Sequence, residues 1–146
     1  MTVIAWDGVS MAADRIGEFF CTRTVRTKIR RIGDTLVGCA GEARASEAVC
    51  AWLESGADPE KFPKIAEQDK ANLLVAGPRG LYLYENSPFP MRLENSFFAI
   101  GSGGEVAMTV MHLGMDARRA VEVACELAVG CGGGVDELKI AAWGCT

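Results

Sequence analysis

The chain has 146 residues, the length of one domain, so we expect a single domain over residues 1–146. A formal net charge of −4 argues against nucleic acid as a partner, and a hydrophobic fraction of 49% excludes disorder as the main state. No apolar run approaches the roughly 18 residues of a membrane span, and no secretory signal is visible in the first ten residues, so we expect a cytoplasmic protein without membrane association.

The first half of the chain is predicted to form strands followed by one helix. The expected strands are 2–6, 9–14, 24–32 and 35–40, arranged as two pairs that are each joined by a short turn containing glycine. Apolar residues at helical spacing then predict a helix over 42–55. Pro59 and Pro63 interrupt the stretch 57–70, which is expected as a loop or a short, broken helix.

The second half is predicted to form strands, two helices and a last strand. The expected elements are strands 72–76, 81–84 and 96–100, a loop over 85–95, helices 104–114 and 116–128, and a strand over 135–143. Asp116 is a good N-cap for the second of these helices. Strands and helices come in blocks instead of alternating, which predicts an α+β protein with two stacked, mainly antiparallel sheets and helices outside them.

The cysteines and the single histidine do not indicate a metal site. The six cysteines include no C-x-x-C pair, and His112 is the only histidine, whereas zinc sites use paired cysteines or histidines at short spacing. We therefore expect reduced, mostly buried thiols, no metal and no cofactor.

Several residues could carry chemistry, but each has an ordinary structural explanation when it is taken alone. The turn at 101–104 resembles an anion-binding loop before a helix, yet it lacks the lysine of a phosphate-binding loop and serves equally as a tight turn. Removal of Met1 would leave Thr2 with a free α-amine beside its hydroxyl, which places a nucleophile and a base in one residue. Lys28 could simply belong to a solvated strand, and Asp14 could cap a turn.

Taken together, five segments in order resemble the proteasome β-subunit family, most closely its HslV-type branch. The segments that carry the resemblance are Met-Thr-Val-Ile at the start, 9–14 ending in Asp14, Thr-Lys-Ile-Arg-Arg-Ile at 27–32, Leu-Val-Gly-Cys-Ala-Gly at 36–41, and Ala-Ile-Gly-Ser-Gly-Gly at 99–104. The chain is thus similar to a short bacterial or phage-like member of these N-terminal-nucleophile (Ntn) hydrolases.

This resemblance implies a fold and a set of catalytic roles. The implied fold is a four-layer α-β-β-α sandwich. Thr2 would be the nucleophile and its α-amine the base, Lys28 would favour the alkoxide, and Asp14 would hold Lys28 in place. Ser102 would support the amine, and the Gly38 N–H would stabilise the oxyanion. The implied activity is that of a threonine-type endopeptidase.

The resemblance also implies partners. It predicts a homo-oligomeric ring, stacked in two layers through the helices at 104–128, that encloses an unfolded polypeptide or peptide substrate. An ATPase regulator is a further implied partner. The shortened stretch 57–70 stands where the family has a long helix on the side that regulators dock against, so docking to a standard unfoldase is in question.

Two departures from the family pattern leave other functions open. Ala128 and Cys131 stand where the family has an aspartate and a serine that support the threonine. The main alternative is therefore a catalytically impaired structural or regulatory ring subunit. An amidase with the same nucleophile and an unrelated anion-binding domain that uses Ser102 are two others.

Overall fold

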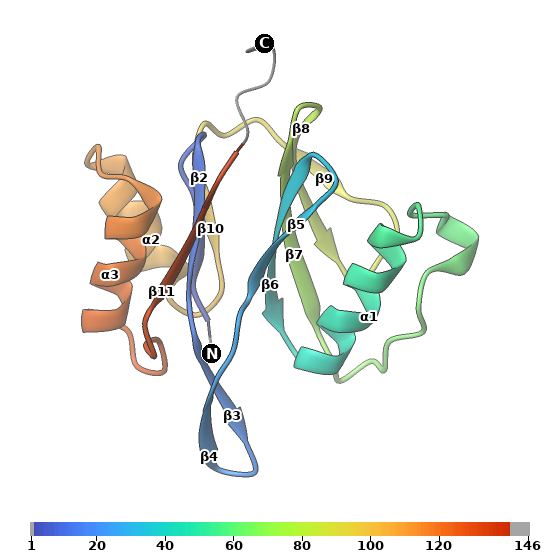
Figure 1. Cartoon of the computed structure of the whole chain (residues 1–146), viewed down its shortest axis with the longest axis horizontal. Coiled ribbons are helices and arrows are strands. Elements are labelled where there is room, and N and C mark those ends of the chain that lie inside the picture. Colours follow the sequence, from blue (N-terminus) through green and yellow to red (C-terminus); the bar gives the residue numbers. More distant parts are fainter. Residues whose placement is uncertain (1, 141–146) are drawn as a thin grey trace.

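The computed structural model describes residues 2–140, which form two antiparallel sheets and a separate hairpin (Figure 1). The first sheet has the order β10 (Phe98–Ile100), β1 (Ile4–Trp6), β2 (Ser10–Asp14), β11 (Val135–Lys139). The second has the order β5 (Ile29–Ile32), β6 (Thr35–Gly41), β7 (Ala71–Gly77), β8 (Gly80–Glu85), β9 (Met91–Leu93). The hairpin consists of β3 (Ile16–Phe19) and β4 (Thr22–Val25).

The helices begin at side-chain caps that the sequence makes available. Helix α1 (Ala43–Glu54) starts after Glu42, whose carboxylate accepts the Ala45 N–H. Helix α3 (Ala117–Leu127) starts after Asp116, whose carboxylate accepts the Arg119 N–H, as its N-cap position predicts. Helix α2 (Gly104–His112) follows the glycine-rich turn, and a short 3-10 helix occupies Pro59–Lys61.

Side chains alternate between the two faces of each sheet and so build three apolar clusters. Ile4 and Met11 of the first sheet face the second sheet, where they meet Leu36 and Leu74. The opposite face of the first sheet is covered by α2 and α3, and the outer face of the second sheet is covered by α1 (Figure 1). Every apolar face of the two sheets is thereby used for packing, which fits the block order of the elements.

The expected strand over 24–32 does not exist as one element. Its first part belongs to the β3–β4 hairpin, and its last part is β5 in the second sheet. The hairpin strand β3 and the edge strand β9 were not expected. Neither strand has the period-two apolar pattern of a half-buried strand, because the hairpin is largely exposed and β9 lies at the sheet edge. The other expected elements are present with ends shifted by a few residues, and positions 141–143 of the expected last strand lie outside the described residues.

The described cysteines are free thiols, and most of them are buried, as expected. Cys39, Cys50 and Cys131 are buried, Cys125 is half-buried and Cys21 is exposed. Among residues 2–140, no helix is long and apolar enough to cross a membrane. The same residues contain no group of three or more His, Cys, Asp or Glu side chains that could hold a metal ion.

Candidate active site

Thr2 lies where the start of the chain meets the turn before α2. Antiparallel pairing of β1 with β10 sets Ile4 opposite Ile100, which brings Thr2 beside residues 101–103. The Thr2 N–H donates to Ser102 Oγ at 3.1 Å, and the Gly103 N–H donates to the Thr2 carbonyl at 3.1 Å. Gly101 has a φ of +94°, and a Cβ at this position would overlap the Thr2 carbonyl. The turn therefore requires glycine there to hold the Thr2 backbone.

Lys28 joins the Thr2 hydroxyl to Asp14. Its Nζ donates to Thr2 Oγ1 at 3.0 Å and to Asp14 Oδ1 at 2.8 Å. Lys28 directly precedes β5 of the second sheet, whereas Asp14 ends β2 of the first. The three residues come from different parts of the sequence and meet only because the two sheets stack.

Asp14 is fixed by backbone donors on both of its oxygens. Oδ1 accepts the Val3 N–H and Oδ2 accepts the Gly132 N–H, each at 3.1 Å. Asp14 is fully buried, and Lys28 is only 2% exposed. A buried ion pair is maintained only when further hydrogen bonds satisfy its charges, and these two N–H groups meet that requirement for the carboxylate.

Burial also changes the acidity of the lysine. Removal of water from the ammonium lowers the pKa of Lys28 below its ordinary value, while the hydrogen bond and the charge of Asp14 oppose this change. The result is a positive group with a lowered pKa within hydrogen-bond distance of a hydroxyl. Such a group stabilises negative charge on the Thr2 oxygen and eases the loss of its proton.

Cys131 lies beside Ser102 and Gly103 in the turn that holds Thr2. Its sulfur lies under the turn, where a Cβ on Gly103 would approach Sγ to 2.9 Å. Burial and the charge of Asp14 raise the pKa of the Cys131 thiol, and a hydrogen bond to Ser102 opposes this. The thiol is therefore mainly protonated at neutral pH, and it contacts Ser102 instead of competing as a thiolate. Ala128, the other departure, is the C-cap residue of α3 and offers no polar group there.

The structure does not bring Gly38 to the Thr2 hydroxyl. Gly38 lies inside β6, opposite Ile29 on one side and Leu74 on the other. The Cys39 N–H donates to the Lys28 carbonyl on the β5 side of the strand. Because N–H groups alternate along a strand, the Gly38 N–H points to the opposite side, toward β7.

Gly41, at the end of β6, faces the other way. By the same alternation, its N–H points to the Lys28 side of β6. Gly41 lines the cavity that contains Thr2, and its φ of +108° suits glycine. A Cβ at Gly41 would overlap the Lys70 carbonyl. In the sequence, Gly41 could have been recognised as the last glycine before the helix.

Gly38 has a packing role that can be measured. A Cβ at Gly38 would overlap the Ile4 side chain and approach Met11 Sδ to 3.1 Å, between the two sheets. We expect Gly38→Ala to lower the free energy of unfolding by about 1–3 kcal/mol, as overpacking of a filled core does. Urea denaturation measures the effect. Gly104→Ala is the matched control, because a Cβ there meets nothing closer than 3.4 Å; equal stability of the two variants would contradict the packing argument.

The cleft beside Thr2 has a volume of about 500 Å³, within the range of ligand sites. The β3–β4 hairpin forms one wall and the start of α1 forms the other. The lining residues are Thr2, Ile16, Gly17, Glu18, Phe19, Thr24, Arg26, Gly41, Glu42, Ala43 and Arg44. The cleft thus opens directly onto the residue that is held by Lys28 and Ser102.

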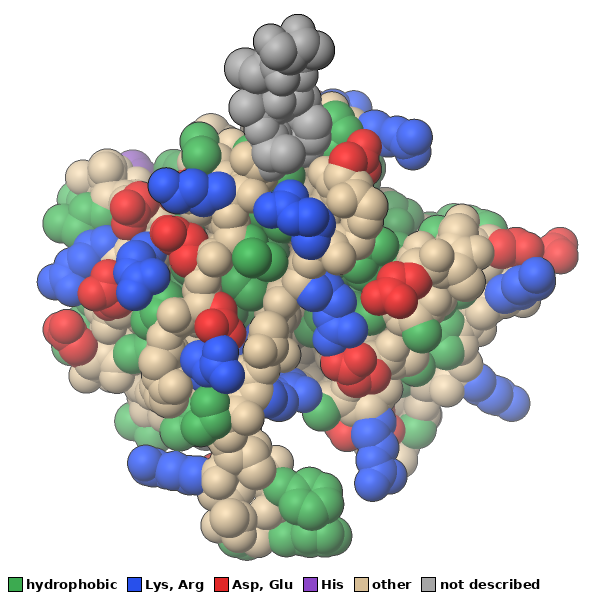
Figure 2. Space-filling model, viewed as in Figure 1, with side chains coloured by type: hydrophobic (Ala, Val, Ile, Leu, Met, Phe, Trp, Pro, Cys, Tyr) green, Lys and Arg blue, Asp and Glu red, His purple; other side chains and the backbone are tan. Residues whose placement is uncertain are grey.

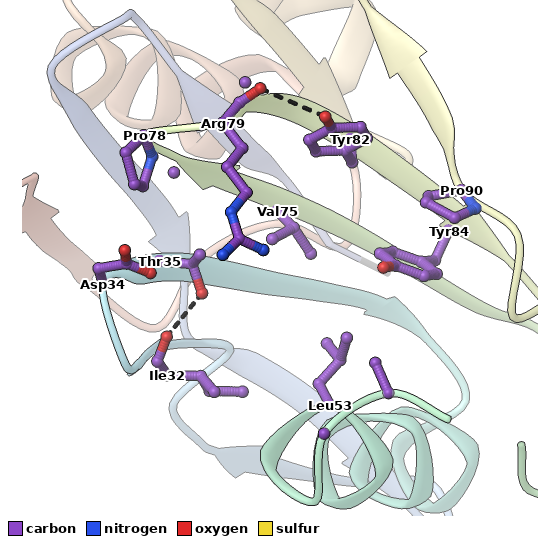
Figure 3. Close-up of a pocket in the computed structure, with 14 residues that line it drawn as sticks. Ile32, Asp34, Thr35, Leu53, Val75, Pro78, Arg79, Tyr82, Tyr84 and Pro90 are labelled. Carbon is purple, nitrogen blue, oxygen red and sulfur yellow. Dashed lines mark hydrogen bonds between the residues drawn. The ribbon is translucent and has the colours of Figure 1, made fainter. Parts of the chain in front are cut away.

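A second cavity, of about 430 Å³, lies elsewhere on the second sheet. Figure 3 shows Arg79 extending over Val75 between the β5–β6 turn and Tyr84, with Leu53 of α1 on the far side. This cavity is not lined by Thr2, Asp14, Lys28 or Ser102. We therefore take the cleft at Thr2 as the candidate active site.

Comparison with known proteins identifies the fold. No protein-family model matches the chain, and no curated protein matches it. Among solved structures, eukaryotic HslV from Trypanosoma brucei superposes with a TM-score of 0.75 at 19% identity, covering 97% of this chain and 99% of that one. Thiobacillus denitrificans BPH in complex with epoxomicin gives a TM-score of 0.68 at 21% identity, covering 97% of this chain and 100% of that one. The chain therefore shares the fold of these proteins over nearly its whole length.

Proposed function

We propose that this protein is a threonine-type endopeptidase whose nucleophile is Thr2, exposed as the N-terminal residue when residue 1 is removed. The observation that carries the proposal is the buried arrangement in which Lys28 Nζ contacts both Thr2 Oγ1 and Asp14 Oδ1 at the edge of a cleft. Similarity to HslV and BPH structures supports the same Ntn hydrolase reaction class. The substrate is an unfolded polypeptide or peptide, and the proposed location is the cytoplasm.

The proposed reaction has two stages. The free α-amine of Thr2 accepts the hydroxyl proton, and Oγ1 attacks the carbonyl carbon of the scissile peptide bond. The resulting tetrahedral intermediate collapses, the C–N bond breaks, and the ammonium returns its proton to the departing amine. Water, deprotonated by the same amine, then attacks the ester, and the bond to Oγ1 breaks to release the carboxylic acid and restore the hydroxyl.

Each neighbouring group has a role that follows from its position. The Lys28 ammonium stabilises negative charge on Oγ1 during attack, and Asp14 holds Lys28 in place. The Ser102 hydroxyl, within 3.1 Å of the Thr2 nitrogen, orients the amine. The N–H of Gly41, which points toward the same side of β6, is the proposed donor to the oxyanion. Donors of this kind are worth about 10²–10³ in rate.

The proposed assembly is a homo-oligomeric ring with its sites facing an enclosed space. The four-layer α-β-β-α sandwich expected from the family resemblance fits the helices on both outer faces. Leu113 and Leu127, near the ends of α2 and α3, are each 70% exposed, and a subunit contact through these helices would cover them. We expect light scattering at micromolar concentration to give a multiple of the 15.6 kDa chain mass; a monomer would contradict the ring. An ATPase regulator is part of the same proposal.

A second candidate function is a structural or regulatory ring subunit with impaired catalysis. The specific observation in its favour is that Ala128, the C-cap of α3, offers no carboxylate, and that Cys131 offers a thiol and not a hydroxyl to Ser102. Against it, a scaffold does not need the buried Thr2–Lys28–Asp14 contacts, which are costly to desolvate.

Hydrolysis and intact mass together test the proposed function. The purified protein is assayed with an unfolded polypeptide, and its mass shows whether residue 1 has been removed. Epoxomicin, which is bound in the BPH structure, serves as a probe of the site. We expect hydrolysis by the trimmed protein and a mass increase of one epoxomicin per chain that is absent in Thr2→Ala. A trimmed, assembled protein that neither hydrolyses nor binds the probe would support the scaffold function instead.

A further inference from the structure

Two thiols meet in the packing between β6 and α1. Cys39 of β6 and Cys50 of α1 belong to the apolar cluster on the outer face of the second sheet, and their Sγ atoms are 3.1 Å apart. An S–S bond is about 2.05 Å long, so a closure of about 1 Å separates this contact from a disulfide. Cys39 is 4% exposed and Cys50 is fully buried. The two sulfurs are therefore placed to react with each other and not with a second protein.

The two thiols differ in acidity because they share a hydrogen bond. This bond from Cys39 lowers the pKa of the Cys50 thiol; burial opposes the change, and the charge of Arg30 adds to it. The same hydrogen bond and burial raise the pKa of the Cys39 thiol. An ion pair between Arg30 of β5 and Glu47 of α1 holds this cation near the pair, and side chains of both charge signs lie over β5 and α1 in Figure 2. Cys50 is thus the better nucleophile, with Cys39 beside it.

The packing of the second sheet gives this pair a purpose. Helix α1 covers the outer face of the sheet (Figure 1). The next stretch, 57–70, adds only the 3-10 helix Pro59–Lys61, which contains no buried residue. The apolar cluster that includes Val49, Trp52 and Leu73 therefore depends mainly on one helix. A covalent bond between α1 and the interior of β6 would hold that helix in place.

We propose that Cys39 and Cys50 are a redox pair that hydrogen peroxide converts to a disulfide, which fastens α1 to β6. The Cys50 thiolate attacks one peroxide oxygen, the O–O bond breaks, and hydroxide leaves, so that Cys50 becomes a sulfenic acid. The Cys39 sulfur then attacks the Cys50 sulfur; the S–S bond forms, the S–O bond breaks, and the departing oxygen takes the Cys39 proton to become water. The two sulfurs lose two electrons in total, and the peroxide is reduced to two molecules of water.

The burial of the pair determines how the reaction proceeds. Peroxide reaches Cys50 when α1 opens locally, so the exposed thiol of Cys21 should be oxidised first. Closing of the helix brings the two sulfurs together again and completes the disulfide. In a reducing compartment the dithiol is the resting form, and the disulfide forms on exposure to the oxidant. Neither sulfur lines the cleft at Thr2, so this redox pair is a feature beyond the proposed peptidase function.

Peptide mapping after oxidation tests the disulfide directly. The reduced protein is treated with hydrogen peroxide, denatured in the presence of a thiol-alkylating reagent, and digested with trypsin, which cuts after Arg44 between the two cysteines. We expect residues 32–44 joined to residues 45–61, and a thiol reductant should separate the two peptides. Urea at a concentration that loosens α1 without unfolding the chain should accelerate the linkage.

Thermal unfolding measures what the linkage does. We expect oxidation to raise the Tm by about 5–10 °C, because a loop of about a dozen residues is closed in the unfolded chain. Cys50→Ser should give neither the linked peptides nor the rise in Tm, and Cys50→Ala serves the same purpose if the serine variant does not fold. Cys125→Ala is the matched control, because it removes a half-buried thiol of α3 and should leave both effects unchanged.

The outcomes do not depend on hydrolysis, so they remain valid if the proposed peptidase function fails. Cys39 and Cys50 that stay alkylated after Cys21 is oxidised, even in mild urea, would overturn the inference. Linkage of either residue to another cysteine, or sulfinic acid at Cys50 without linkage, would also overturn it. Linked peptides with an unchanged Tm would contradict the role of the bond in holding α1.

Discussion

Replacement of Thr2 by alanine is expected to abolish peptide hydrolysis, with a loss of at least about 10³-fold that leaves the fold intact. The change removes the attacking oxygen, whereas Lys28 keeps its ion pair with Asp14. The free energy of unfolding should fall by only about 1 kcal/mol, the value of one hydrogen bond. Thr2→Ser should keep part of the activity, because the hydroxyl and the α-amine remain. Peptide hydrolysis and urea denaturation of the three proteins measure these effects.

Cys131 is the rival nucleophile for this experiment. It lies beside the same turn, and thiolates are intrinsically better nucleophiles than hydroxyls. Its raised pKa and burial argue that it does not attack substrate. We expect Cys131→Ala to retain most of the activity. Activity that persists in Thr2→Ala and disappears with a thiol-alkylating reagent would overturn the assignment of Thr2.

Replacement of Lys28 by methionine is expected to damage both stability and activity. It leaves the Asp14 carboxylate buried without its cation, which costs about 3–5 kcal/mol for pairs of this kind. It also removes the charge next to Thr2 Oγ1, so hydrolysis should fall by about 10²–10⁴-fold. Denaturation and hydrolysis by the folded fraction measure the two effects separately.

An exposed ion pair provides the matched control for Lys28. Arg30 and Glu47 form an ion pair at the surface, where the Glu47 side chain is 59% exposed. Arg30→Gln should change stability by less than about 1 kcal/mol. The double variant Lys28→Met with Asp14→Asn should recover part of the lost stability, because no charge is left buried. Similar costs for Lys28→Met and Arg30→Gln would contradict the buried-pair argument.

The strands and helices of the core could be predicted because they carry strong periodic patterns and turn signals. Strand β7 and helix α3 both appear near their expected bounds, and Asp116 caps α3 as predicted. The β3–β4 hairpin escaped prediction for a specific reason. Its turn places Phe20 and Cys21 at positive φ, +48° and +62°, where two-residue hairpin turns normally have asparagine or glycine. No turn signal is therefore visible in the sequence, and the exposed strands show no alternation.

The site was only partly predictable. The resemblance of five ordered segments to the proteasome β-subunit family singled out Thr2, Asp14, Lys28 and Ser102, and the structure brings these four together. It does not bring the Gly38 N–H to Thr2. Successive N–H groups of a strand point to opposite sides, and that of Gly38 points toward β7. In the sequence, nothing distinguishes Gly38 from Gly41 as a backbone donor. Only the pairing of β6 with both β5 and β7 distinguishes their N–H groups.

By itself, the sequence determined the α+β class and the antiparallel blocks, because local periodicity and turn chemistry are written along the chain, and the resemblance of its motifs to a known family pointed to Thr2, Asp14, Lys28 and Ser102. The tertiary structure alone decided what those residues can do together. Stacking of the two sheets buries Lys28 against Asp14, the Val3 and Gly132 N–H groups fix the carboxylate, and the hairpin and the start of α1 form the walls of the cleft at Thr2. These contacts join residues far apart in the sequence, so their distances and dielectric surroundings exist only in the folded chain.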